Sequence, residues 1–182
     1  MQILSNMDKN IQAKLMKFCT YQDRCIKEIT DKLFKLEVWR EDHDVYINFL
    51  IDHQFLDDQR FAASFVRGKF RIKRWGKLKI KNHLQQKGIA NSFIESAIRE
   101  QIDEEKYKFT AIQLLENKSN TLKEKDPYKR KQKLLNHLLQ KGFESELILS
   151  LINQLATARP TLSASSGDIS KFDFPLIPEV AK

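Results

Sequence analysis

The stretch KIKNHLQQKG at residues 79–88 returns as KLLNHLLQKG at residues 133–142, with seven of ten positions identical at an offset of 54 residues. The likeness extends downstream, where Ile94 corresponds to Ile148. Self-similarity at a fixed period of about 20–50 residues is typical of repeat architectures, in which one supersecondary unit is stacked several times. We therefore predict that the chain is a tandem array.

Apolar residues in and around both copies follow the spacing of amphipathic helices. Ile80 and Leu84 lie four residues apart, and Leu134 and Leu138 repeat that interval. Recurrence at three or four residues places apolar side chains on one face of a helix. No segment alternates apolar and polar residues for long, so we predict no strands. Comparable stripes occur along the rest of the chain: Ile11, Leu15, Phe18 and Cys19; Ile26, Ile29, Leu33 and Leu36; Val45, Phe49, Leu50 and His53; Phe61, Phe65 and Val66; Ile94, Ala97, Ile98 and Ile102; Tyr107, Ala111, Leu114 and Leu115; Leu147, Ile148, Leu151, Ile152 and Leu155.

The stripes group into three copies of a three-helix unit. A weaker copy of the repeated stretch lies upstream, around Ile29 and Leu33. A single unit of this size would leave apolar surface exposed, so neighbouring units must pack on one another or pack their own helices tightly. The predicted fold is all-α, an elongated tandem array of about nine helices, with repeat 1 at residues 10–58, repeat 2 at 59–105, repeat 3 at 106–156 and a flexible, disordered tail at 157–182.

The predicted tail differs from the repeats in composition. Residues 157–170 are rich in Thr, Ser and Ala, and prolines interrupt residues 171–182. Such a composition favours disorder. The alternative is that its apolar cluster docks as a short segment; the members of that cluster are Phe172, Phe174, Leu176 and Ile177.

Composition excludes several classes of protein. With 5 Gly and 4 Pro in 182 residues, the chain lacks the frequent tight turns of a β-sandwich or barrel. No uncharged apolar run approaches the roughly 18 residues that cross a bilayer, and residues 1–10 lack the apolar core of a signal peptide. The two cysteines, Cys19 and Cys25, do not make a disulfide framework. We therefore predict a cytoplasmic protein with free thiols and no membrane contact.

The net charge of +8 comes from one window of the sequence. Residues 59–94 hold ten Lys and Arg and no Asp or Glu, whereas residues 1–58 are acidic overall. A cationic field of this purity attracts a polyanion or an acidic protein surface. The alternatives are a solvated helix face and neutralisation in space by carboxylates of the first third. The predicted binding cations are Arg60, Arg67, Lys69, Arg71, Lys73, Arg74, Lys77, Lys79, Lys81 and Lys87.

Two aromatic residues, Phe70 and Trp75, lie among these cations. Aromatic rings in a basic segment stack nucleic-acid bases while the cations hold phosphates, so Trp75 joins the predicted binding residues. The alternative is that Phe70 or Trp75 packs between helices. Gly76 permits a tight turn before the next helix. Lys77 then brings a cation to a helix N-terminus, an unfavourable position that sometimes indicates a binding site.

No catalytic or metal-binding pattern occurs in the sequence. It has no nucleotide-binding loop, nucleophile elbow or zinc-protease motif, and the spacing of its four histidines supplies no ligand set. Asp57 and Asp58 are adjacent carboxylates directly before a predicted helix, where one caps free N–H groups and the other favours the helix dipole. Gly88 and Gly142 follow apolar stripes, as expected just past helix ends. We predict no enzymatic activity, no metal and no cofactor.

Two segments together resemble the RecX family of bacterial regulatory proteins. They are FLDDQRFAASFVR at residues 55–67 and WGKLKIKNHLQQKGI at residues 75–89. The similarity covers about residues 10–155, although Glu37 stands where the later repeats carry glycine. The positions that carry the pattern, with the glycine of repeat 3 included, are Asp57, Asp58, Phe61, Gly76, Gly88 and Gly142.

The resemblance implies tandem three-helix repeats and a regulatory role without catalysis. Members of the family bind the RecA recombinase filament on DNA, lie along its groove and limit its growth, which lowers strand exchange and the DNA-damage response. Some also contact DNA. We therefore expect RecA filaments as the partner, with the basic window meeting acidic protein surface or DNA. The alternative is a direct nucleic-acid-binding module for single- or double-stranded DNA that needs no RecA. Charge and the lack of a heptad seam favour a monomer.

Overall fold

The computed structural model describes residues 8–157, which form nine α-helices, one short 3-10 helix and no β-strand. The all-α prediction is therefore confirmed for these residues. Apart from Thr157, the predicted tail and its apolar cluster lie outside the described residues. The helices are α1 (Lys9–Tyr21), α2 (Ile26–Lys35), η2 (Arg40–Asp42), α3 (His43–Asp52), α4 (Asp58–Lys73), α5 (Lys77–Gln86), α6 (Asn91–Gln101), α7 (Glu104–Thr121), α8 (Pro127–Lys141) and α9 (Ser145–Thr157).

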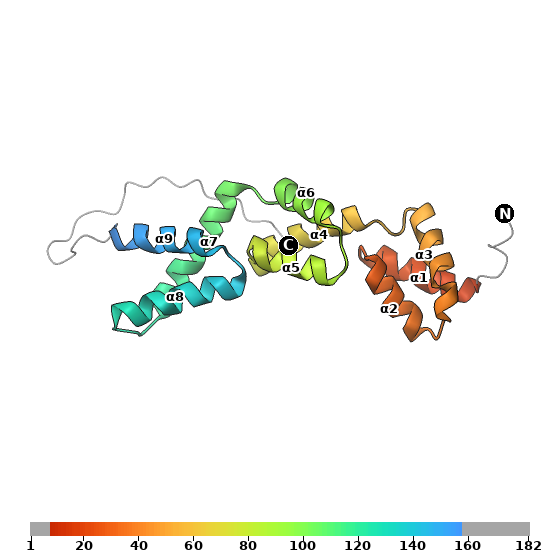
Figure 1. The fold of residues 1–182 in the computed structure, drawn as a ribbon, viewed down its shortest axis with the longest axis horizontal. Coiled ribbons are helices and arrows are strands. Elements are labelled where there is room, and N and C mark those ends of the chain that lie inside the picture. The colour runs from red at the N-terminus through yellow and green to blue at the C-terminus, as the bar shows by residue number, and fades with distance from the viewer. Residues whose placement is uncertain (1–7, 158–182) are drawn as a thin grey trace, which may run out of the picture.

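The α-helices form three groups that follow one another along the long axis of the molecule (Figure 1). We call α1–α3 repeat 1, α4–α6 repeat 2 and α7–α9 repeat 3. The helix pairs in extensive contact, such as α4 with α6 and α7 with α8, belong to the same repeat. An elongated array of three-helix repeats is thus confirmed, while the residue borders drawn between the repeats stay predictions.

The first helix of each repeat begins behind an aspartate. Asp8, Asp57 and Asp103 are the N-caps of α1, α4 and α7, and each side chain accepts a hydrogen bond from a backbone N–H of the first turn. Such a cap satisfies a donor that the helix itself leaves free, which is worth about 1 kcal/mol. The same signal therefore starts each repeat.

The second helix of each repeat ends in a left-handed residue. Glu37, Gly88 and Gly142 follow α2, α5 and α8 with φ of +58°, +80° and +88°. Glycine adopts this conformation without a steric penalty, and a residue with a Cβ adopts it at a cost. Repeat 1 therefore makes the same turn as the others, although its sequence lacks the glycine.

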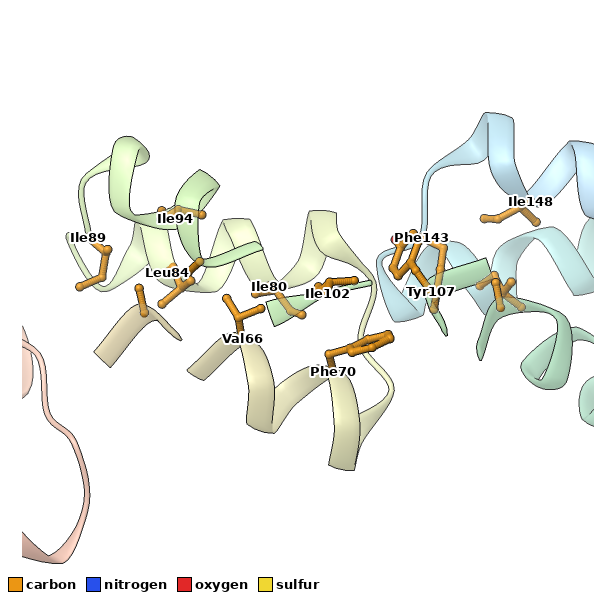
Figure 2. Close-up of a cluster of buried hydrophobic side chains, with 14 of the residues drawn as sticks. Val66, Phe70, Ile80, Leu84, Ile89, Ile94, Ile102, Tyr107, Phe143 and Ile148 are labelled. Atoms are coloured by element: carbon orange, nitrogen blue, oxygen red, sulfur yellow. The ribbon is translucent and has the colours of Figure 1, made fainter. Parts of the chain in front are cut away.

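The core has two parts. Repeat 1 has a core of its own around Leu15, Leu33 and Leu50, whereas the cores of repeats 2 and 3 are continuous. Figure 2 shows the continuity, with Tyr107 and Phe143 lying together between the two repeats. Their rings stack with centroids 4.9 Å apart. Apolar packing therefore joins repeats 2 and 3 into one block.

The buried face of α3 differs from the predicted stripe. Val45 is half-buried and His53 is exposed, while His43 and Tyr46 are buried. The Nε2 atom of His43 lies 3.1 Å from the carbonyl oxygen of Val38, and the Tyr46 hydroxyl accepts from the backbone N–H of Asp8 at 3.0 Å. The predicted stripe was right at Phe49 and Leu50 and wrong at His53, because His43 and Tyr46 face the core instead, with their polar atoms hydrogen-bonded.

Two glycines bring the backbones of repeats 2 and 3 into direct contact. The N–H of Gly76 donates to the carbonyl of Lys141 at 2.8 Å, and the N–H of Leu78 donates to the carbonyl of Gly142 at 3.0 Å. A Cβ on Gly76 would collide with the Gly142 backbone, and one on Gly142 would collide with Lys79. Gly76 has φ of −76°, so close approach, and not the predicted tight turn, is what requires glycine here.

The contact between repeats 1 and 2 is largely polar, although Cys25, directly before α2, is buried in the core of repeats 2 and 3. The carboxylate of Asp23, between α1 and α2, accepts from Arg60 at 3.0 Å and from the Ser64 hydroxyl at 2.6 Å. These contacts, the Ser64 hydrogen bond first, lower the pKa of Asp23. Lys87 of repeat 2 pairs with Glu28 of α2 at 2.5 Å. The two ends of repeat 2 are therefore joined to their neighbours by different chemistry.

Candidate interaction surface

Helix α4 separates apolar from cationic residues. Phe61, Ala62, Val66 and Phe70 are buried in the core. Its last turn and C-cap carry Arg71, Lys73 and Arg74, all of them exposed. Burial of the apolar face against α5 and α6 fixes the rotation of the helix, so the cations are held at the surface.

Four of the ten predicted binding cations are ion-paired. Arg60 and Lys87 pair with Asp23 and Glu28, so the acidic first third does neutralise part of the basic window. The other two pairs are Lys81 with Glu95, at 3.0 Å, and Lys77 with Glu104. The Glu104 carboxylate also offsets the unfavourable electrostatics of Lys77 at the N-terminus of α5, because a helix N-terminus favours negative charge.

The other six cations have no ion pair within residues 8–157. Arg67 and Arg74 donate only to the neutral side chains of Ser64 and Gln113. Arg71 and Lys73 make no hydrogen bond, ion pair or ring contact with a described residue. Like charges at i, i+4 repel each other on a helix, and an anionic partner relieves that repulsion. The unpaired cations, gathered mainly on the second half of α4, are Arg67, Lys69, Arg71, Lys73, Arg74 and Lys79.

The two aromatic residues of the basic window have different environments. Phe70 is 6% exposed and lies in the core, so it cannot stack on a base. Trp75 is half-buried, with its ring centroid 4.6 Å from that of His83. The ammonium groups of Lys69 and Lys79 lie 5.2 and 4.8 Å from the Trp75 ring centroid. Two ammonium groups therefore already lie over the Trp75 ring, and Lys79 also donates to the carbonyl of Gln140 at 3.1 Å, so a base could stack on Trp75 only by displacing a cation.

A groove of about 390 Å³ lies beside α4, next to the start of α2. Its lining includes Phe65, Gly68 and Ile72, with Lys69 and Lys73 among them. Sequence reasoning missed Gly68 and Ile72. Two sequence signals could have indicated them: Gly68 is a glycine inside an amphipathic helix, and Ile72 is an isoleucine outside the apolar stripe of that helix.

The adjacent carboxylates have structural contacts. Asp57 Oδ1 accepts from the N–H of Arg60 at 2.9 Å, which caps α4. Asp58 Oδ1 accepts from the N–H of Ile26 at 3.3 Å, which ties α2 to α4, and burial raises the pKa of Asp58. Arg60 forms no ion pair with Asp57 or Asp58, because its guanidinium group pairs with Asp23. Among residues 8–157, no three His, Cys, Asp or Glu gather closely enough to hold a metal ion.

The thiols of Cys19 and Cys25 are free and buried. Cys19 belongs to the core of repeat 1 and Cys25 to the larger core of repeats 2 and 3. Burial raises the pKa of both thiols. In the part of the chain that the structure describes, no helix is both long and apolar enough to cross a membrane.

Family models match two of the three repeats. The second three-helix domain of RecX matches residues 57–98, and the third three-helix domain of RecX matches residues 110–152. A protein of Clostridium botulinum (strain Eklund 17B / Type B) named regulatory protein RecX is 33% identical over 159 residues, which cover 85% of this chain and 73% of that protein. The RecX of Oceanobacillus iheyensis is 35% identical over 146 residues. This chain spans 53% of the Oceanobacillus protein, about half of its length.

Solved structures share the fold. A crystal structure of regulatory protein RecX matches with a TM-score of 0.72 at 27% identity, over 79% of this chain and 72% of that one. The crystal structure of RecX from Lactobacillus salivarius matches with a TM-score of 0.70 at 28% identity, over 81% of this chain and 96% of that one.

Proposed function

The chain belongs to the RecX family of regulatory proteins, and on this premise we propose that it binds RecA filaments on DNA and limits their recombinase activity. It would thereby modulate DNA repair and the DNA-damage response. The observation that carries the proposal is the cluster of six unpaired cations on and beside α4, a helix whose orientation is fixed by its buried face. We further propose that the protein acts in the cytoplasm as a monomer, without catalysing a reaction.

An elongated array suits a filament as partner. A filament presents the same subunit surface and the same nucleic-acid backbone at regular intervals. Repeats 2 and 3 are joined by backbone hydrogen bonds at Gly76 and Leu78, so contact points on the two repeats keep a constant separation. Two weak contacts on one rigid body bind together with an effective concentration that raises the overall affinity. Each attachment is electrostatic in part, so salt weakens it.

We test the proposal with charge reversal at three exposed, unpaired cations. The variant carries Arg71→Glu, Lys73→Glu and Arg74→Glu, which changes the net charge by six without touching an ion pair. We expect the wild-type chain to slow ATP hydrolysis by RecA on single-stranded DNA at stoichiometric amounts, and the variant to lose this effect while its circular dichroism spectrum is unchanged.

The matched control reverses three exposed cations of repeat 3 that make no ion pair among the described residues. They are Lys125, Lys129 and Lys131, and their reversal changes the net charge by the same amount. We expect this control to inhibit RecA nearly as well as wild type. Equal loss of inhibition in both variants would mean that total charge matters and the α4 cluster does not.

The alternative function is direct nucleic-acid binding without RecA. The concentration of unpaired cations around the half-buried Trp75 is the observation that favours it, because such cations pair with backbone phosphates. Comparing affinity for bare single- and double-stranded DNA with affinity for RecA-coated DNA at matched salt separates the two functions. Tighter binding to bare DNA would support the alternative, and a marked preference for coated DNA would support RecA as partner.

A further inference from the structure

Gly68 has no structural reason to be glycine in the chain alone. It lies inside the 16-residue helix α4, where glycine destabilises by roughly 0.5–1 kcal/mol relative to alanine. Its φ is not positive, and a Cβ added to it would meet no atom within 4 Å. A glycine that neither the backbone conformation nor the packing requires leaves the helix face open to close approach by another molecule.

The groove at Gly68 has an apolar centre. Phe65 is half-buried one turn before Gly68, and Ile72, one turn after it, is 77% exposed. An isoleucine this exposed on an ordered helix leaves apolar surface in water, which burial against a partner would remove. An apolar centre within a polar, charged border is the usual anatomy of a protein–protein interface.

The charge around the groove is positive. Lys69 and Lys73 line it and have no ion pair within the described residues. The two carboxylates that line its other side are compensated, since Asp23 pairs with Arg60 and Glu28 pairs with Lys87. An occupant with carboxylates is therefore attracted by the free ammonium groups and meets little repulsion from the rear wall.

The geometry favours a protein segment over a nucleic acid at this groove. The ammonium of Lys69 lies 5.1 Å from the Phe65 ring centroid, so that ring face is already covered and does not offer a stacking platform. Ile72 has no aromatic face. An apolar side chain of a protein segment would gain contact with Phe65 and Ile72 there, whereas a base would have to displace Lys69 before it could stack on Phe65.

We propose that this groove binds an acidic protein segment. The segment inserts one apolar side chain between Phe65 and Ile72 and crosses the helix at Gly68, where no side chain stands in its way. Its carboxylates pair with Lys69 and Lys73. The inference rests on the proposed function, because on a RecA filament the segment belongs to a RecA subunit. It assigns the groove beside α4 to protein, and leaves the unpaired cations outside the groove available to DNA.

The test fills the groove without disturbing the fold. Gly68→Leu adds a side chain whose Cβ meets no atom within 4 Å, so we expect equal or higher thermal stability, because the helix loses its glycine. We expect its affinity for RecA-coated single-stranded DNA to fall by about tenfold or more, with affinity for bare single-stranded DNA unchanged. Ile72→Ser, at an exposed site, removes the apolar anchor and is expected to weaken filament binding in the same way.

Gln59→Leu is the matched control. Gln59 is exposed on α4 nine positions before Gly68, which at about 100° per residue is the opposite side of the helix. The substitution introduces the same leucine side chain. We expect the Gln59→Leu variant to bind RecA-coated and bare single-stranded DNA with the affinity of wild type.

Each outcome decides between the interpretations. Undiminished filament binding by Gly68→Leu and Ile72→Ser would overturn the inference and leave the proposed function standing. Parallel loss of bare-DNA and filament binding would reassign the groove to nucleic acid and overturn it too. Failure of the wild-type chain itself to bind RecA filaments would remove the proposed function, and the inference with it.

Discussion

Tyr107 holds repeats 2 and 3 together through both its ring and its hydroxyl. The side chain is 2% exposed, and its ring stacks on Phe143 and lies 6.0 Å from Phe70. Its hydroxyl accepts from the N–H of Lys77 at 3.1 Å and donates to a carboxylate oxygen of Glu144 at 2.6 Å. In the sequence it was one member of an apolar stripe, with nothing to indicate its polar partners.

The Tyr107 hydroxyl predicts a loss of stability at alkaline pH. Burial, together with the Glu144 carboxylate, raises the pKa of Tyr107 far above its ordinary value of about 10. The folded state therefore keeps this proton where the unfolded state releases it. The stabilisation is complete below about pH 10 and falls above it by about 1.4 kcal/mol per pH unit.

We expect Tyr107→Phe to be less stable than wild type by about 1–3 kcal/mol at neutral pH, because Lys77 N–H and Glu144 lose a partner. The difference should shrink as pH rises above about 10, in urea unfolding measured across pH 8 to about 11.5. A difference that stays constant across this range would contradict the assignment.

At the scale of single elements, the turn after the second helix is common to all three repeats. Gly88 and Gly142 adopt it as glycines, while Glu37 adopts the same left-handed conformation with a Cβ. Glu37 in place of the family's glycine thus adds backbone strain to the turn, while the turn keeps the same geometry as those at Gly88 and Gly142. Helix α4 also ends in a left-handed residue that is not glycine, Arg74 with φ of +51°, where a cation of the proposed binding surface stands in place of the preferred glycine.

Glu37→Gly is expected to stabilise repeat 1 by about 0.5–1 kcal/mol, because it relieves the left-handed strain. The reciprocal change, Gly88→Ala, should destabilise by about 1 kcal/mol for the backbone reason alone, since a Cβ on Gly88 meets no atom within 4 Å. Chemical denaturation of both variants measures the two effects. If Glu37→Gly were destabilising, the turn would owe its stability to the glutamate side chain.

At the scale of the whole molecule, the two junctions differ in what holds them. Repeats 2 and 3 share a core and backbone hydrogen bonds, whereas repeats 1 and 2 meet largely through Asp23, Arg60, Glu28 and Lys87. Apolar and backbone contacts are insensitive to screening by salt, while partly exposed ion pairs are weakened by it. The molecule is therefore a block of two repeats that share a core, with repeat 1 attached mainly by ion pairs and by the buried Cys25.

This asymmetry predicts a selective response to salt. In roughly 1 M salt, where the Debye length is about 3 Å, we expect peptides around residues 22–30 to exchange amide hydrogens faster than at low salt. Peptides around residues 138–144, at the other junction, should exchange at an unchanged rate. Asp23→Asn at low salt should reproduce the effect at the first junction. Equal acceleration at both junctions would contradict the division into a rigid block and an ion-paired repeat.

The amino-acid sequence by itself determined the helical class, the three-fold repetition and the location of the basic window. These are local properties: apolar spacing, capping aspartates and self-similarity are all read along a short stretch of chain. Only the tertiary structure decided which cations stay unpaired and why Gly76 is glycine. The partners involved are distant in sequence, since Arg60 meets Asp23 across 37 residues and Lys87 meets Glu28 across 59. Charge and close approach act through space, so a pattern read along the chain does not contain them.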